Sequence, residues 1–80
     1  MKINIVLYGI ARDIIGASKH EFEVEKEISV SELLLKLKEE FPKFELLTSL
    51  LVAVNDEYAE QNYMIQENDE VVLIPPVSGG

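Results

Sequence analysis

The residues with the clearest chemical potential are the last six of the sequence, Pro75-Pro76-Val77-Ser78-Gly79-Gly80. The two prolines favour a stiff, extended polyproline conformation, and the small residues that follow keep the backbone narrow and tolerant of positive φ. Fully extended, such a segment spans about 20 Å. It would deliver the α-carboxylate of Gly80, which becomes reactive only after activation, for example as an acyl-adenylate. On these residues alone, a frayed end or a leftover linker remains an alternative.

The cysteine, histidine and glutamate content of the chain argues against a metal site and against catalysis by a side chain. The chain has no cysteine, which excludes a thiolate nucleophile, a disulfide and a cysteine-based metal site. The single histidine, His20, excludes a histidine-rich metal cluster and has no sequence neighbour that would make it a catalytic base. The regularly spaced glutamates at positions 21, 23, 25 and 27 indicate a solvated strand face, not converging catalytic carboxylates. We therefore expect no metal and no bound cofactor, and Gly80 is the best candidate for a working group.

Composition and charge limit the class of protein and partner. Eighty residues with 48% hydrophobic side chains predict one small globular domain. The net charge of −8 argues against nucleic acid and anionic membranes as partners and favours basic ones. No signal peptide is visible, and the most apolar stretch, residues 46–54, is far shorter than the ~20 residues of a membrane helix. We expect a soluble, cytoplasmic protein.

Hydrophobic alternation predicts two strands at the start of the chain, over residues 2–8 and 20–28, paired as an antiparallel hairpin. Between them we expect a turn or short helical turn that Gly16 closes. Arg12 and Asp13, within that turn, are expected to form a weak local salt bridge, and the alternative is a contact with a partner.

A helix is the clearest element of the sequence. Ser29 and Glu32 have the spacing of a capping box at its start. An apolar stripe at three- and four-residue spacing follows, and Pro42 is expected to end the helix. Residues 44–50 are ambiguous between a loop and a short helix.

The last third of the chain is predicted to contain two strands. Residues 51–54 form a short strand that leads into a turn at Asn55-Asp56. Residues 61–67 are interpreted as a polar connection with its apolar side chains tucked in, before a second turn at Asn68-Asp69. The run over residues 71–74 is apolar at every position, which is typical of a central strand, so we place it beside the first strand.

This order of elements predicts an α+β, β-grasp (ubiquitin-like) fold, a mixed sheet with one main helix packed on one face. The domain would cover residues 1–74 and the extended tail residues 75–80. One helix cannot cover both sheet faces, so Val6, Tyr8 and alternate residues of the last strand form an exposed patch for a protein partner. The alternative is that the segment 44–50 covers this face, and both interpretations remain open.

The final stretch NDEVVLIPPVSGG closely resembles the C-terminal signature of the molybdopterin synthase small subunit family, the sulfur carriers of molybdenum cofactor biosynthesis. The stretches VLYGIARDIIG, ISVSELLLKLKEEFP and VAVNDEY resemble that family's first strand and turn, first long helix and third-strand hairpin. The resemblance covers nearly the whole chain, and PPVSGG is its most specific part. Asn68 departs from the family's usual glycine, but asparagine tolerates the left-handed conformation of such a turn.

The resemblance implies a carrier without catalytic side chains. An ATP-using, ubiquitin-activating-like adenylyltransferase would adenylate Gly80, and a sulfurtransferase system would convert it to a thiocarboxylate. The tail, with Val77 and Ser78 seating it and Gly79 giving clearance, would then enter the large synthase subunit. There the sulfur would pass to a pyranopterin precursor.

Three alternatives remain. The chain could be a related sulfur carrier for thiamine or tRNA thiolation, although such carriers usually lack the Pro-Pro-Val-Ser lead-in. It could be a ubiquitin-like modifier that joins Gly80 to target lysines. It could also be a plain β-grasp interaction domain with an inert tail.

Overall fold

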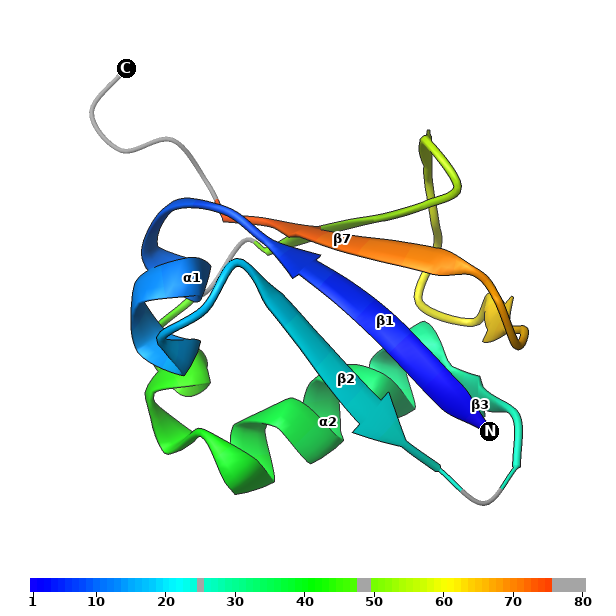
Figure 1. The fold of residues 1–80 in the computed structure, drawn as a ribbon, viewed down its shortest axis with the longest axis horizontal. Coiled ribbons are helices and arrows are strands. Elements are labelled where there is room, and N and C mark those ends of the chain that lie inside the picture. Colours follow the sequence, from blue (N-terminus) through cyan, green and yellow to red (C-terminus); the bar gives the residue numbers. More distant parts are fainter. Residues whose placement is uncertain (25, 48–49, 76–80) are drawn as a thin grey trace.

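The computed structural model describes residues 1–24, 26–47 and 50–75. The described part of the chain forms a five-stranded sheet in the order β2-β1-β7-β4-β5, with a two-stranded sheet of β3 and β6 beside it. Along the chain the elements are β1 (Lys2–Leu7), α1 (Gly9–Ile15), β2 (Lys19–Glu23), β3 (Ile28–Ser29), α2 (Val30–Glu40), the 3₁₀ helix η1 (Pro42–Leu46), β4 (Leu51–Val54), β5 (Glu57–Tyr58), β6 (Met64–Ile65) and β7 (Glu70–Ile74) (Figure 1).

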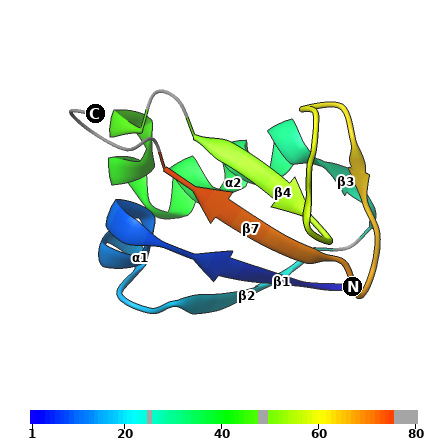
Figure 2. The ribbon, with the colours of Figure 1, turned by 90° about the horizontal axis from the view of Figure 1, so that it is seen from above.

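The last strand, β7, lies at the centre of the main sheet, as its continuous apolar run predicts (Figure 2). It pairs in parallel with β1, where Leu7 is opposite Leu73, and antiparallel with β4, where Val52 is opposite Leu73. The first and last strands of the described chain therefore hold each other in place. The predicted antiparallel pairing of the first two strands is also confirmed.

Helix α2 covers one face of this sheet (Figure 1). Its buried residues Val30, Leu33 and Leu37 belong to the same hydrophobic core as the inward-facing residues of β1 and β7. The predicted capping box is present at its start, because the Glu32 amide donates to Ser29 Oγ at 3.2 Å and the Ser29 amide donates to Glu32 Oε1 at 3.0 Å. The hydrogen bond from the Ser29 amide, and after it the hydrogen bond from the Ser29 side chain, lower the pKa of the Glu32 carboxyl group. Pro42 follows the helix and opens η1.

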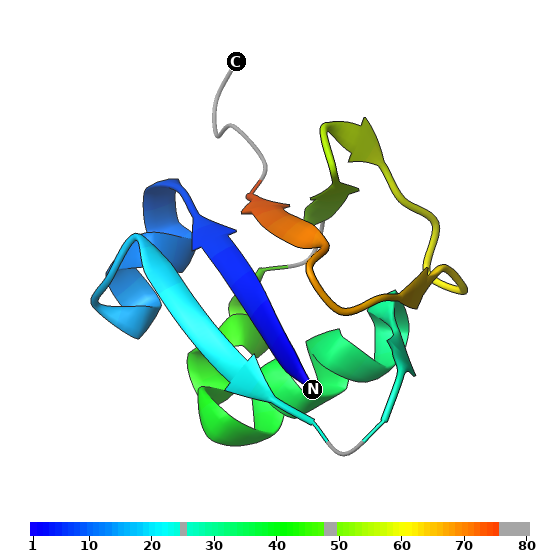
Figure 3. The ribbon, with the colours of Figure 1, turned by 45° about the vertical axis from the view of Figure 1, so that its right-hand side comes forward.

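The prediction of one strand over residues 20–28 is wrong. The second strand ends at Glu23, and the ladder closes with two bonds between Val24 and Met1, at 2.9 Å and 2.6 Å. Beyond this point the chain leaves the main sheet, and Ile28 pairs with Ile65 in the small sheet (Figure 3).

The connection over residues 61–67 also differs from the prediction. It contains β6, in which Ile65 is fully buried, whereas Tyr63 and Met64 are 37% and 43% exposed. The ambiguous segment that begins at Phe44 is partly helical, and its helical turn starts earlier, at Pro42.

Candidate functional site

The predicted tail begins where β7 ends. Ile74, the last residue of β7, is paired with Leu51, and Pro75 follows half-buried outside the strand. Pro76, Val77, Ser78, Gly79 and Gly80 lie outside the described residues. The structure therefore places the root of the predicted site, in line with the central strand of the sheet.

An open apolar face lies beside this root, on the side of the sheet opposite α2. The strand register places a row of side chains across five strands, Lys19, Val6, Val72, Ala53 and Tyr58. Tyr8 and Leu51, nearer the tail root, are 56% and 50% exposed. A shallow hollow of about 520 Å³ runs over this surface from Glu70 to Ile74. We call this surface the open face.

The open face agrees with the first of the two interpretations drawn from the sequence. Phe44, which belongs to the segment proposed as a cover, is fully buried in the core cluster with Leu33 and Leu37. It is thus on the side of the sheet that α2 covers. Val6, Val72 and Ile74 are only half-buried.

A buried carboxylate, Asp69, holds the start of β7. It is 9% exposed and accepts hydrogen bonds from the Gln66 amide at 2.8 Å, from Asn55 Nδ2 at 2.9 Å and from the Tyr63 hydroxyl at 3.0 Å. Burial raises the pKa of Asp69, but the three hydrogen bonds outweigh it and the net pKa lies below the ordinary value. The same contact raises the pKa of the Tyr63 hydroxyl, because that group donates to a carboxylate. We call this cluster the Asp69 hub.

The sequence predicts the hub only as two separate turns. Asn55, Asp56 and Asn68 all have positive φ, as the turn residues there suggest. The link between the turns is carried by Asn55, whose Oδ1 also accepts from the Glu70 amide at 3.0 Å. The aspartate directly before the apolar run of the central strand is the one local sign in the sequence, but it does not show which side chains bind it.

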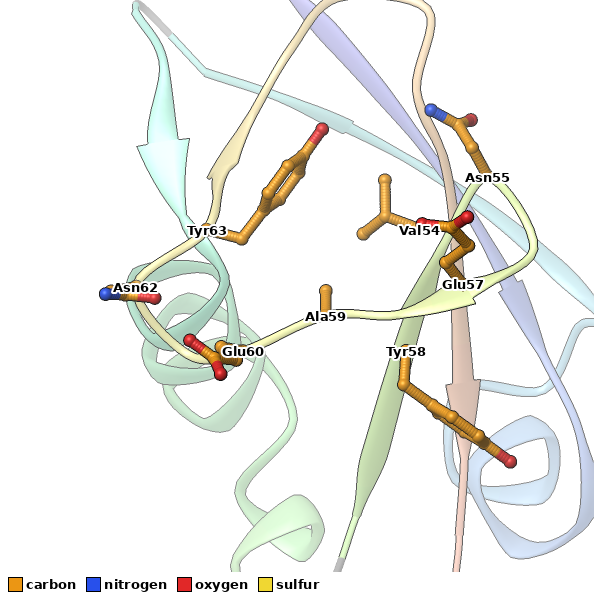
Figure 4. Close-up of a pocket in the computed structure, with 8 residues that line it drawn as sticks. All are labelled: Val54, Asn55, Glu57, Tyr58, Ala59, Glu60, Asn62 and Tyr63. Atoms are coloured by element: carbon orange, nitrogen blue, oxygen red, sulfur yellow. The ribbon is translucent and has the colours of Figure 1, made fainter.

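A second hollow, of about 500 Å³, lies at the other end of β4 (Figure 4). Val54 and Tyr63 point into it, and Glu57 and Glu60 stand at its margin. Because Val54 is paired with Val71 and Leu51 with Ile74, this hollow is at the far end of the sheet from Pro75. It is therefore separate from the tail root.

The remaining candidates from the sequence have structural roles or none. His20 packs edge-to-face against Phe22 and Phe41, with ring centroids 5.6 Å apart in each pair. The expected Arg12–Asp13 ion pair is wrong, since among the described residues the only ion pair joins Lys2 and Glu21, at 3.7 Å. Within the same residues, no group of acidic, histidine or cysteine side chains is placed to hold a metal ion. No described helix is long and apolar enough to cross a membrane.

Comparisons with known proteins identify the family of the chain. The ThiS family matches residues 5–80. A molybdopterin synthase sulfur carrier subunit from Dictyostelium discoideum is 36% identical over 99% of this chain and 96% of its own. One from Arabidopsis thaliana is 31% identical over 100% of this chain and 84% of its own.

Solved structures agree with the fold. The putative molybdopterin converting factor subunit 1 from Pyrococcus furiosus superposes with a TM-score of 0.87 at 22% identity, over 96% of this chain and 99% of that one. A subunit in the complex of subunits 1 and 2 of the molybdopterin-converting factor from Helicobacter pylori 26695 gives 0.68 at 25% identity over both whole chains. The predicted β-grasp fold is thereby confirmed. The chain belongs to the ThiS family, and it is similar along its length to sulfur carrier subunits of molybdopterin synthase.

Proposed function

We propose that this chain carries sulfur as a thiocarboxylate on Gly80 and donates it in the synthesis of molybdopterin. The observation that carries the proposal is the similarity over nearly the whole chain to relatives named as molybdopterin synthase sulfur carriers. The position of Pro75 directly after the central strand also supports the proposal. Among residues 75–80 only Ser78 has a nucleophilic side chain, so the Gly80 carboxylate is the better candidate for the group that carries sulfur.

The proposed chemistry uses the Gly80 carboxylate and no metal or cofactor bound to this chain. A carboxylate oxygen bonds to the α-phosphorus of ATP in an activating enzyme, and pyrophosphate leaves. A sulfur donor at the oxidation level of hydrosulfide then attacks the acyl carbon, and AMP leaves with the carboxylate oxygen. The thiocarboxylate sulfur forms a bond to a carbon of the acceptor and displaces that carbon's leaving group. Water then attacks the acyl carbon, the acyl C–S bond breaks, the sulfur stays on the acceptor, and the Gly80 carboxylate is restored.

The proposed partners are the activating enzyme, a sulfurtransferase system and the large synthase subunit, which would supply the catalytic side chains. The complex of subunits 1 and 2 in Helicobacter pylori supports the last of these. The open face offers exposed apolar contact area next to the tail root, where Tyr8 and Leu51 are about half exposed. The net charge of −8 favours partners with basic surfaces. The cytoplasmic location expected from the sequence is part of the same proposal.

Intact-mass measurement tests the carrier step directly. The chain ending at Gly80 is incubated with the activating enzyme, ATP and a sulfur donor, and we expect the mass increase of one oxygen replaced by sulfur. A matched variant with one residue appended after Gly80 keeps the fold and should show no increase. The loaded chain is then mixed with the large subunit and the pyranopterin precursor, and molybdopterin is measured.

The same experiment separates the alternatives. An unchanged mass of the Gly80 chain, in a system that loads a known carrier, would refute the carrier function. Loading without molybdopterin formation would favour thiamine or tRNA thiolation. High-mass conjugates to lysine side chains in cell extract would favour a modifier.

A further inference from the structure

We propose that Gly9 is a positioning residue for the tail, because it packs against Pro75 and sets the direction in which the chain leaves the sheet. The inference rests on the proposed sulfur-carrier function. It adds a residue outside residues 75–80 to the machinery that delivers Gly80.

The parallel register of β1 and β7 brings these two residues together. The last pair of this register is Leu7 with Leu73, and Gly9 and Pro75 each follow two residues later in the chain. Gly9 is also the first residue of α1, and helix α1 lies beside the Ile74 end of β7 (Figure 2). The turn from β1 into α1 therefore meets the root of the tail.

A side chain at Gly9 would be crowded at this meeting point. A Cβ atom at Gly9 would lie 3.3 Å from Cγ of Pro75, closer than the optimal carbon–carbon contact of about 3.5–4.0 Å. Gly9 also has a φ of +56°, which glycine adopts without steric cost and alanine does not. The proline ring thus borders the space that a Cβ atom at Gly9 would occupy.

Pro75 makes this contact directional. Its ring fixes its own φ and removes the N–H that would extend the β1–β7 ladder. It also holds Ile74 in an extended conformation, while Ile74 remains paired with Leu51 on the other side. With the ring beside Gly9, the position of Pro75 at the end of β7 is restricted, and this reduces the ordering cost when a partner takes up the tail.

The chain contains its own control for a test of this idea. Gly16, at the other end of α1, also has positive φ, +89°, but a Cβ there would meet nothing within 4 Å. Gly9→Ala and Gly16→Ala therefore impose the same class of backbone strain on the same helix. Only Gly9→Ala pushes on the root of the tail.

The decisive measurement compares both variants as preloaded thiocarboxylates in single-turnover sulfur transfer with the large subunit, well below their melting temperatures. We expect both to lose similar thermal stability. Gly9→Ala should lower the transfer rate about tenfold and Gly16→Ala by less than about twofold, since a 1 Å misplacement of a reacting group costs up to about 100-fold. Equal transfer rates in the two variants would overturn the inference.

Two further measurements test the contact between Gly9 and Pro75 separately from the proposed sulfur-carrier function. The double variant Gly9→Ala/Pro75→Ala should transfer no more slowly than Pro75→Ala alone, because the proline ring that the added methyl group pushes is gone; additive losses would contradict the contact. A nuclear Overhauser effect between the Gly9 α-protons and the Pro75 ring protons should appear in the unmodified chain and in Gly16→Ala. Its absence from the unmodified chain would overturn the inference, whereas failure of that chain to accept sulfur would refute the proposed function.

Discussion

Replacing Asp69 with asparagine tests how far the Asp69 hub stabilises the central strand. The carboxylate accepts three hydrogen bonds, one from Asn55 on Oδ1 and two from Gln66 and Tyr63 on Oδ2. The asparagine side chain has nearly the same shape but only one acceptor oxygen. Its amide group must therefore face a donor, and its remaining bonds lose the assistance of a negative charge.

The expected cost follows from these contacts. One of the three hydrogen bonds is lost and leaves two N–H groups facing each other, which costs about 1 kcal/mol or more of stability. The other two are no longer made to a charged group and lose about 1 kcal/mol each, so we expect a total near 3 kcal/mol. A chain of 80 residues has about 4–12 kcal/mol of stability in all. The melting temperature should fall by about 12–24 °C.

Urea denaturation at a series of pH values gives the assay. The folded-state pKa of Asp69 lies below its ordinary value of 3.8, so its contribution is complete above that pH and disappears as the pH falls through the folded-state pKa. The difference between the unmodified chain and Asp69→Asn should therefore shrink in acid. The matched variant Asp56→Asn removes the same charge from an exposed turn residue and should change stability by less than about 0.5 kcal/mol. A difference below about 1 kcal/mol at neutral pH, or one that does not change in acid, would refute the reasoning.

Three further predictions concern the capping box, the core and the open face. Ser29→Ala should cost about 1 kcal/mol in urea denaturation, because the Glu32 amide loses its acceptor; a loss of only a few tenths would contradict the cap's role. Leu33→Ala should cost about 2–5 kcal/mol, since Leu33 is fully buried, whereas Leu35→Ala on the same helix, 59% exposed, should cost less than about 0.5 kcal/mol. Tyr8→Ala should weaken binding of the large subunit about tenfold in calorimetry. Leu35→Ala, on the opposite side of the sheet, is the control for this binding measurement. If Tyr8→Ala and Leu35→Ala bind the large subunit with equal affinity, the open face is not the docking surface.

Much of the fold could be predicted because its strongest determinants are local. The apolar run over Val71–Ile74 placed β7 at the centre, and the spacing of Ser29 and Glu32 marked the start of α2. These patterns depend on hydrogen bonds and periodicity within a few residues. The family resemblance was likewise carried by short stretches spread along the chain.

The errors concern contacts between distant segments. Val24 and Ile28 continue the alternation of β2, so nothing local shows that Ile28 pairs with a different strand from Val24. Strand β6 is two residues long and forms only because β3 lies opposite it. The direction of Phe44, which decided whether the open face is covered, depends in the same way on tertiary packing.

In the candidate site, too, the features that depend on local residue types could be predicted, and the contacts between distant residues could not. The tail residues and Gly80 as the working group were predicted from residue types together with the family resemblance, and they remain predictions because residues 76–80 lie outside the described part. The Asp69 hub and the contact between Gly9 and Pro75 join residues that are 14 and 66 positions apart. Neither could be found without the register of the sheet.

The parallel pairing of β1 with β7 has a consequence for biosynthesis. Ile5 and Leu7 emerge from the ribosome early, but their neighbours Val71 and Leu73 emerge only with the last strand of the described chain. Contacts of such wide sequence separation form late and slowly. A nascent or truncated chain that lacks β7 keeps an unpaired β1 and an incomplete core, and it is open to proteolysis. Every molecule that folds fully therefore already contains β7, the strand that leads into the tail.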